Sequence, residues 1–238
     1  MNKNNNFIFI KLILLYLIIL VNGCCNFKKD EELTFPINST KSTQLACYYK
    51  DIINTNNDVT ELRLPSEYDG KTRLFNPQEV KIPVKGENFL SQYVGDNVSY
   101  YELGHFEYKN NTYRLIIYNK IGESDTLLLN VQINSYDENG KLVDALLLSS
   151  FFGYEDIIRF SDFIIHSDYT INIDNYVIYR YKESEDGLST IIFKEPMPQV
   201  YLKENYQIEN GRFKLISRRE VSQGEKMKRT LNIPCLRH

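Results

Sequence analysis

The histidines are the first residues to consider for chemistry, and there are three of them: His105, His166 and His238. A catalytic zinc site uses several histidine, cysteine or carboxylate ligands, often two histidines one helical turn apart or two closely spaced cysteines. These histidines have no such spacing, so we predict no metal site and no cofactor. The Gly-x-Ser-x-Gly turn that holds a hydrolase nucleophile is also missing. The motifs therefore lean away from an enzyme and identify no catalytic residue.

Aspartates recur every six residues in one part of the chain, at Asp156, Asp162, Asp168 and Asp174. Carboxylates gathered at one sheet edge could bind calcium. Aspartate also favours turns because its side chain accepts hydrogen bonds from nearby backbone amides, and this is the interpretation that we prefer. An enzyme alternative, a hydrolase of envelope polymers, predicts that two or more of the last three aspartates and His166 converge in a cleft with shifted pKa values.

The N-terminus combines a short cationic segment with an apolar stretch from Leu12 to Val21. At about 1.5 Å per residue, this stretch covers about half of the ~30 Å hydrocarbon core of a bilayer. It is therefore too short for a comfortable transmembrane helix. Its length is typical of a secretory signal, which we assign to residues 1–23 and expect to be helical.

The residues that follow, Val21-Asn22-Gly23-Cys24, resemble the lipobox of bacterial lipoproteins. The resemblance implies a diacylated thiol at Cys24, cleavage before it, and a membrane as partner through the acyl chains. Downstream, Lys29-Asp30-Glu31 resembles the surface-export signal of lipoproteins in the Bacteroidota. We expect an exported protein anchored in the cell envelope, with the outer membrane as the expected site. Whether it faces the periplasm or the cell surface stays open.

Two further cysteines, Cys47 and Cys235, lie near the two ends of the mature chain. An exported protein meets an oxidising compartment, so these two residues are a candidate disulfide. The alternative is a pair of buried free thiols. A catalytic pairing of Cys47 with His105 is a weaker alternative, because exported cysteines are usually bridged or inert.

Composition indicates a soluble globular body. Hydrophobic residues make up 42% and charged residues 25% of the chain. The net charge of −3 provides no basic field for nucleic acid, so no nucleic-acid partner is predicted. We divide the chain into the signal, a tether over residues 24–44 and a single domain over residues 45–238.

From Val98 onward, apolar and polar residues alternate, which is the pattern of half-buried strands. Asn130, Gln132 and Asn134, for example, occupy the polar face of one such strand. Asn139-Gly140 and Asn210-Gly211 suit two-residue hairpin turns, and further turn signals occur at Lys109-Asn110-Asn111 and Asp186-Gly187. One short helix is predicted over residues 87–93. The apolar faces of the predicted strands contain these residues: Tyr113, Leu115, Ile117, Leu127, Leu129, Val131, Ile133, Ile171, Ile173, Val200, Leu202, Phe213 and Leu215.

The fold class that we expect is mainly β, an antiparallel meander of hairpins with few short helices. The meander forms a sandwich or a partly closed barrel, and the sequence does not choose between them. Tyr113-Arg114-Leu115-Ile116-Ile117-Tyr118 and the later run from Tyr136 to Asp144 resemble small β-rich lipoproteins of the Bacteroidota. That resemblance covers residues 80–217 and implies an exported β-domain without a known activity.

The function that we expect is a lipid-anchored envelope protein, acting as a non-enzymatic binding or structural module. One alternative is a carrier of an apolar ligand in a partly closed barrel, with a cavity lined around Leu129 and Ile171. The other is the envelope-polymer hydrolase described above. Each of these alternatives makes a prediction about where named side chains lie.

Overall fold

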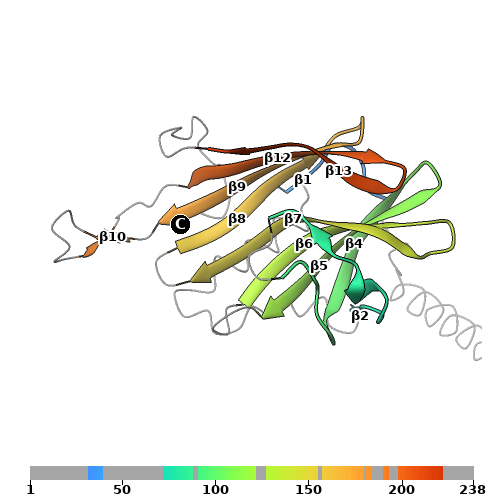
Figure 1. Cartoon of the computed structure of the whole chain (residues 1–238), viewed down its shortest axis with the longest axis horizontal. Coiled ribbons are helices and arrows are strands. Elements are labelled where there is room, and N and C mark those ends of the chain that lie inside the picture. Colours follow the sequence, from blue (N-terminus) through green and yellow to red (C-terminus); the bar gives the residue numbers. More distant parts are fainter. Residues whose placement is uncertain are drawn as a thin grey trace, which may run out of the picture. The chain divides into compact units, whose positions relative to one another are not determined.

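The alternating segments form one sheet of eleven strands (Figure 1). The computed structural model describes residues 32–39, 72–87, 91–121, 127–154, 157–179, 181–183, 190–192 and 198–221. The predicted antiparallel meander is confirmed, because the long strands follow one another as antiparallel neighbours. These are β4 (Ser99–Tyr108), β5 (Asn111–Ile121), β6 (Leu127–Tyr136), β7 (Leu142–Tyr154), β8 (Ile157–Ile165), β9 (Thr170–Tyr179), β12 (Gln199–Glu209) and β13 (Arg212–Glu220).

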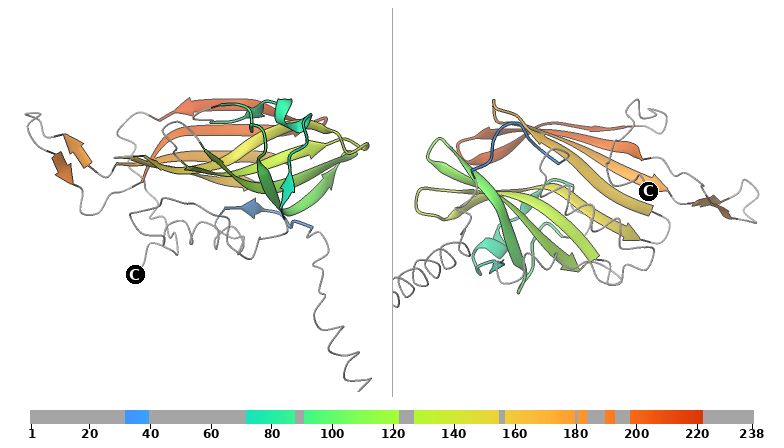
Figure 2. Two further views of the ribbon diagram at one scale, coloured as in Figure 1. Left: turned by 90° about the horizontal axis from the view of Figure 1, so that it is seen from below. Right: turned by 180° about the vertical axis from the view of Figure 1, so that it is seen from behind.

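The sheet divides into two layers at β7, because this strand changes its neighbour along its length. Its residues from Leu142 to Phe151 lie opposite β6, and only Phe152–Tyr154 lie opposite β8. The half formed by β4 to β7 and the half formed by β8, β9, β12 and β13 therefore lie as two layers (Figure 2). The sheet is not closed into a barrel, since β13 ends one side of the strand order and the short β2 (Arg73–Leu74) ends the other.

Besides β2, four short strands and one 3-10 turn complete the part of the chain that the structure describes. β1 (Ile37–Asn38) pairs with β8, and β3 (Val84–Lys85) pairs with β7 in parallel. A 3-10 turn, η2 (Glu79–Lys81), precedes β3. β10 (Tyr181–Glu183) and β11 (Thr190–Ile192) form a separate two-stranded sheet. Residues 32–39 fall within the predicted tether, and Ile37 in this segment is nevertheless buried in the core.

The main core lies between the inward faces of the two layers. Tyr113, Leu115 and Ile117 are at most 1% exposed, which confirms the apolar face predicted for that strand. Leu129 and Ile171, around which a ligand cavity was predicted, belong to the same hydrophobic cluster and are 2% and 0% exposed. The other members of the cluster are Ile37, Leu103, Phe106, Val131, Ile133, Leu146, Leu148, Phe163, Ile165, Ile173, Tyr206, Ile208 and Phe213.

A second cluster covers the outer face of the β4–β7 layer. Phe75, Val84 and Val94 pack there against residues such as Ile116 and Leu147. Val94, which follows the helix predicted over residues 87–93, is buried in this cluster, whereas Tyr93 is exposed. Among those residues, 88–90 lie outside the described part, and the others are not helical. The helix prediction was therefore wrong for Glu87 and for residues 91–93.

The same cover overturns the prediction of a polar, half-buried face on β6. Asn130, Gln132 and Asn134 are 4%, 1% and 0% exposed, so β6 is buried on both faces. The amides of Gln132 and Asn134 form hydrogen bonds within the fold: the Tyr118 hydroxyl donates to Gln132 at 2.7 Å, and Gln132 donates to Asn134 at 2.6 Å. Asn134 donates in turn to the Tyr136 hydroxyl at 3.1 Å. We call these four residues, Tyr118, Gln132, Asn134 and Tyr136, the amide ladder.

The hairpin turns follow their sequences, with one exception. Asn210 and Gly211 both have positive φ, as a type I′ two-residue turn requires, and Lys109-Asn110 forms the same kind of turn. At Asn139-Gly140 only the glycine has positive φ, and the Asp137 amide bonds to the Lys141 carbonyl. The loop is thus three residues long, because the Asp137 carboxylate accepts hydrogen bonds from the amides of Asn139 and Lys141. Asp186-Gly187 lies outside the described residues.

Candidate functional site

An ionisable side chain lies inside the sandwich, on the inward face of β12. The side chain of Glu204 is 0% exposed. Strand alternation places Glu204 on the same face as the buried Leu202 and Tyr206. A charged group that is removed from water needs a partner of opposite charge and hydrogen bonds to its remaining lone pairs. The surroundings of Glu204 provide both.

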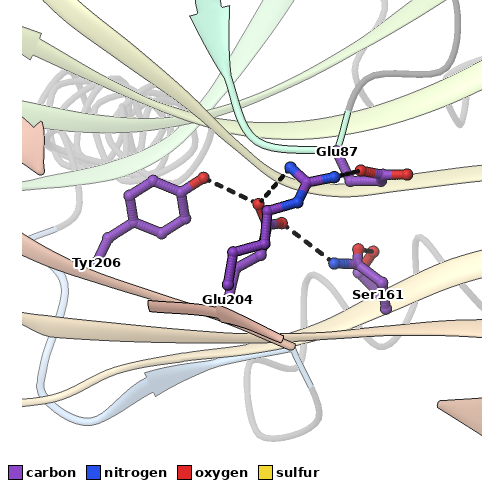
Figure 3. A network of polar contacts seen from close by, with 6 residues as sticks. Glu87, Ser161, Glu204 and Tyr206 are labelled. Atoms are coloured by element: carbon purple, nitrogen blue, oxygen red, sulfur yellow. Dashed lines mark hydrogen bonds and ion pairs between the residues drawn. The ribbon is translucent and has the colours of Figure 1, made fainter. Parts of the chain in front are cut away.

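Three donors converge on the Glu204 carboxylate from three strands (Figure 3). The Tyr206 hydroxyl and the Arg218 guanidinium, on β12 and β13, both donate to Oε1, at 3.1 and 3.2 Å. The amide of Asn175 on β9 donates to Oε2 at 3.2 Å. Both carboxylate oxygens are therefore engaged by side chains of the fold.

The network continues in both directions from this centre. Arg218 also donates to Glu87 at 2.6 Å, and Glu87 follows β3 on the side of the other layer. At the other end, the Ser161 hydroxyl of β8 donates to Asn175 at 2.6 Å. The Ser149 hydroxyl of β7 then accepts from the Ser161 amide at 3.3 Å. We call this set the Glu204 network: Glu87, Ser149, Ser161, Asn175, Glu204, Tyr206 and Arg218.

Burial and charge oppose each other at the centre of the Glu204 network. Burial raises the pKa of the Glu204 carboxyl, while Arg218, Tyr206 and Asn175 act to lower it. Burial also disfavours the charged form of Arg218, but the carboxylates of Glu204 and Glu87 outweigh it and raise the pKa of the guanidinium. The pKa of Tyr206 is raised, first by burial and then by Glu204. Burial of the Glu204 carboxylate thus carries a desolvation cost, which its cation and its hydrogen bonds offset.

The members of the network differ in their access to solvent. The side chains of Arg218 and Glu87 are 45% and 22% exposed, whereas that of Glu204 is fully buried. A molecule arriving from solvent would therefore meet Arg218 first. Chemically, the arrangement can hold the two layers together through a chain of ion pairs and hydrogen bonds. The arrangement also presents the half-exposed guanidinium of Arg218, a residue of the edge strand β13, to solvent.

The regularly spaced aspartates fall into different environments. Asp162 and Asp174 lie directly opposite each other on β8 and β9. Asp162 accepts a hydrogen bond from Ser39 at 3.1 Å, and Asp174 forms an ion pair with Lys203 at 2.8 Å. Burial raises the pKa of Asp162, with Ser39 opposing the rise and Asp174 adding to it. Two of the predicted carboxylates are therefore neighbours, and each is held by another side chain.

Asp168 and His166 lie apart from that pair, at the turn that joins β8 to β9. The Asp168 carboxylate accepts hydrogen bonds from the hydroxyl and the amide of Thr170, which lower its pKa. This is the turn role that we preferred for these aspartates. The His166 ring lies 3.0 Å from the Asn172 amide nitrogen. Asp156 lies outside the described residues.

Within the ranges that the structure describes, no group of three or more histidine, cysteine, aspartate or glutamate side chains is placed to hold a metal ion. In the same ranges there is no helix that is long and apolar enough to cross a membrane. His105 lies 3.8 Å from Glu102 on β4. The lipid-attachment residue Cys24 and the candidate disulfide residues Cys47 and Cys235 all lie outside the described residues.

The Glu204 network was not predicted from the sequence. A signal for Glu204 was present, because it has the same parity as Leu202, Tyr206 and Ile208 in an alternating strand. Arg218 gave no such signal. A β-bulge in the β12–β13 pairing shifts the register between Asn205 and Tyr206, and only this shift brings Arg218 opposite Glu204.

Comparisons with protein-family models, with curated proteins and with solved structures found no match to this chain. A function is therefore inferred from the N-terminal sequence, the contacts of the buried network and the edges of the sheet.

Proposed function

We propose that this protein is a lipid-anchored component of the cell envelope whose β-domain acts as a binding or structural module. The observation that carries the proposal is the apolar stretch Leu12 to Val21, whose last residue begins Val21-Asn22-Gly23-Cys24. This order of a cationic start, a short apolar run and a small residue before cysteine is the pattern of a lipoprotein signal. Acyl chains on Cys24 would hold the domain at a membrane surface, at about 0.8 kcal/mol per buried methylene.

The ionic contacts of the domain support a role without catalysis. A catalytic carboxylate has to reach a substrate, with its pKa tuned to that task. Here Glu204 is fully buried and bound by three donors, Asp162 is bound by Ser39, and Asp174 is paired with Lys203. These side chains are engaged in holding strands together. The ligand-carrier and hydrolase alternatives remain predictions.

The anchor is tested by labelling cells that express the whole chain with an alkyne analogue of palmitate. Two adjacent cysteines make a matched pair of variants, Cys24→Ala and Cys25→Ala. We expect label on the wild type and on Cys25→Ala and none on Cys24→Ala. We also expect globomycin, which inhibits lipoprotein signal peptidase, to cause the unprocessed precursor to accumulate. Label retained by Cys24→Ala, or absent from the wild type, would refute the anchor.

A further inference from the structure

Two strands of the sandwich have edges that their neighbours in the sheet cover only in part. β8 pairs with β7 through residues 157–159, and its residues from Phe160 to Ile165 extend beyond that pairing. In the other layer, β2 pairs with β4 at Ser99 and Tyr100, and the rest of β4 extends beyond it. Backbone amides and carbonyls along such edges need partners, either from water or from another segment of the chain.

The segment from Glu32 to Ser39 covers both of these edges. At its start, the Leu33 amide donates to the His105 carbonyl of β4 at 2.8 Å. At its end, the Ser39 amide donates to the Phe163 carbonyl of β8 at 3.2 Å, and between these two bonds β1 pairs with β8. We call residues 32–39 the strap, because they join one layer of the sandwich to the other.

Side chains hold the strap in place as well. Ile37 is 5% exposed and belongs to the main core between the layers. The ring of Phe35 lies edge-on to the rings of Phe106 and Tyr169, at centroid distances of 5.0 and 5.5 Å. The compact unit of the chain accordingly begins at Glu32. The strap is therefore part of the folded domain, although the sequence assigned it to the tether.

This placement shortens the connection between the domain and the proposed lipid anchor. A tether over residues 24–44 has twenty residue steps and could span about 72 Å when fully extended. The strap fixes the chain at Glu32, which is eight steps after Cys24, so the greatest span is about 29 Å. For comparison, the ten residues of β4 extend over about 34 Å. The anchor therefore reaches less far than the length of one long strand.

The strap also determines which side of the domain lies nearest to the anchor. Next to β8, β1 extends the strand order β13-β12-β9-β8, so β1 and β13 lie at opposite ends of this layer (Figure 2). The distance across the layer is about 19 Å, from strand spacings of about 4.8 Å. At the β13 end, the Phe213 amide donates to Asp144 at 2.8 Å, and the Phe213 carbonyl accepts from Lys85 at 2.7 Å. Farther along β13, Leu215 is 45% exposed, on the side away from the strap.

We propose that the strap holds the β-domain close to the lipid headgroups, with the side formed by β4 and β8 nearest to the membrane and with β13 on the far side. The proposal rests on the proposed lipid anchor at Cys24 and adds the position from which the binding module acts. A partner of the module is then met on the β13 side and close to the membrane, because the anchor spans at most about 29 Å.

The first measurement tests the strap without the anchor. In the full-length Cys24→Ala variant, purified in detergent, hydrogen exchange with mass spectrometry reports on the amides of residues 32–39. We expect exchange at least ten-fold slower than in a free peptide of the same sequence. Ile37→Asn should restore fast exchange, whereas Thr34→Asn, at an exposed position, should not. Fast exchange in Cys24→Ala itself would overturn the proposal and leave the anchor unaffected.

The second measurement tests which side lies nearest to the membrane. The acylated wild type is placed in vesicles of phosphatidylethanolamine and phosphatidylglycerol that contain a rhodamine-labelled lipid as energy acceptor. A fluorescent amino acid replaces either Glu107 on β4 or Arg212 on β13, both of which are exposed. We expect the efficiency of energy transfer to be at least two-fold higher from position 107. Equal efficiencies would overturn the assignment of the near side.

Two insertions of the same twelve-residue Gly-Ser linker test the reach of the anchor. Between Glu31 and Glu32 the linker lies before the strap and adds about 20 Å of root-mean-square reach. Between Ser42 and Thr43 it lies after the strap and leaves the reach unchanged while the strap is bound. We expect energy transfer from position 107 to fall at least two-fold for the first insertion only.

The other outcomes of the insertion pair each contradict the proposal. An equal fall for both insertions would show that the strap does not fix the chain in the anchored protein. No fall for either would assign the proximity to contacts between lipid and the surface of the domain. An absence of acyl label from the wild type would refute the anchor, and the labelling experiment detects that failure separately. If Ile37→Asn does not fold, the insertion pair decides the question with the strap sequence intact.

Discussion

Glu204, at the centre of its network, and the amide ladder are both buried, but the two networks lie on opposite faces of the sheet and are built from different groups. The Glu204 network lies between the layers and contains a carboxylate and a half-exposed guanidinium. The amide ladder lies beneath the cover that contains Phe75, Val84 and Val94, and it consists of neutral amides and phenols. A charge in the interior requires an opposite charge, whereas a neutral amide requires only hydrogen bonds.

This difference suggests how each network contributes to the fold. The Glu204 network joins β7, β8, β9, β12 and β13 to Glu87, so it ties the edge strand to both layers. The four residues of the amide ladder lie on β5 and β6, which are already paired through ten residue positions, and beyond these strands Tyr136 interacts with Glu79 of η2. We therefore expect loss of the charged network to affect stability more than loss of the neutral one.

The largest effect is expected for Arg218→Met. The substitution leaves Glu204 ionised in the core without its cation, which should cost about 3 kcal/mol of unfolding free energy, at the low end for a broken buried pair because Arg218 is half-exposed. Urea denaturation at neutral pH measures this change in unfolding free energy. Arg212→Met on the same strand removes an exposed cation and should change stability by less than about 0.5 kcal/mol. Similar values for the two variants would contradict the comparison.

An intermediate effect is expected for Gln132→Leu in the amide ladder. The change removes the partner of the Tyr118 hydroxyl and of the Asn134 carbonyl, both buried, and should cost about 2 kcal/mol. Tyr118→Phe deletes only one hydroxyl and should cost about 1 kcal/mol. The same denaturation measurement applies. If Gln132→Leu were as stable as the wild type, the ladder would contribute no specific hydrogen-bond energy.

The smallest effect is a difference in pH dependence. The pKa of Glu204 is raised in the folded protein above its ordinary value, so the folded state binds more protons than the unfolded state just above pH 4.5. This group therefore lowers stability as pH rises from 4.5 through its folded pKa. Glu204→Gln should make that downward slope shallower and leave the part of the same sign that the raised pKa of Asp162 contributes. Gln132→Leu should retain the full slope, because the amides and phenols of the ladder do not titrate there. A wild-type slope persisting in Glu204→Gln would assign it to another group.

The two networks differ in how far their contacts could be predicted from the sequence. The alternation in β6 identified Gln132 and Asn134 as one face of a strand, and that was correct. Their burial was not predictable, because the cover comes from distant residues such as Phe75, Val84 and Val94, whose local sequence does not show which strand they will cover. Alternation reports which residues share a face, and only the neighbouring elements determine whether that face meets water.

The Glu204 network illustrates the opposite case. The parity of Glu204 with Leu202 and Tyr206 already placed a carboxylate on the inward face of its strand. Its partners come from positions 29 residues earlier, at Asn175, and 14 residues later, at Arg218. The first contact depends on the pairing of β9 with β12 and the second on a β-bulge, and neither leaves a local mark in the sequence.

By itself, the sequence determined the mainly β class, the antiparallel order of the strands, the two-residue turn at Asn210-Gly211 and the presence of a turn at Lys109-Asn110-Asn111, because alternation and tolerance of positive φ are local properties of the chain. Tertiary structure alone decided that the sheet divides at β7, that Lys85 and Asp144 close the edge at Phe213, and that the edge at Leu215 remains exposed. Those outcomes depend on which distant segments meet, and that is fixed by the packing of whole layers rather than by neighbours in the chain.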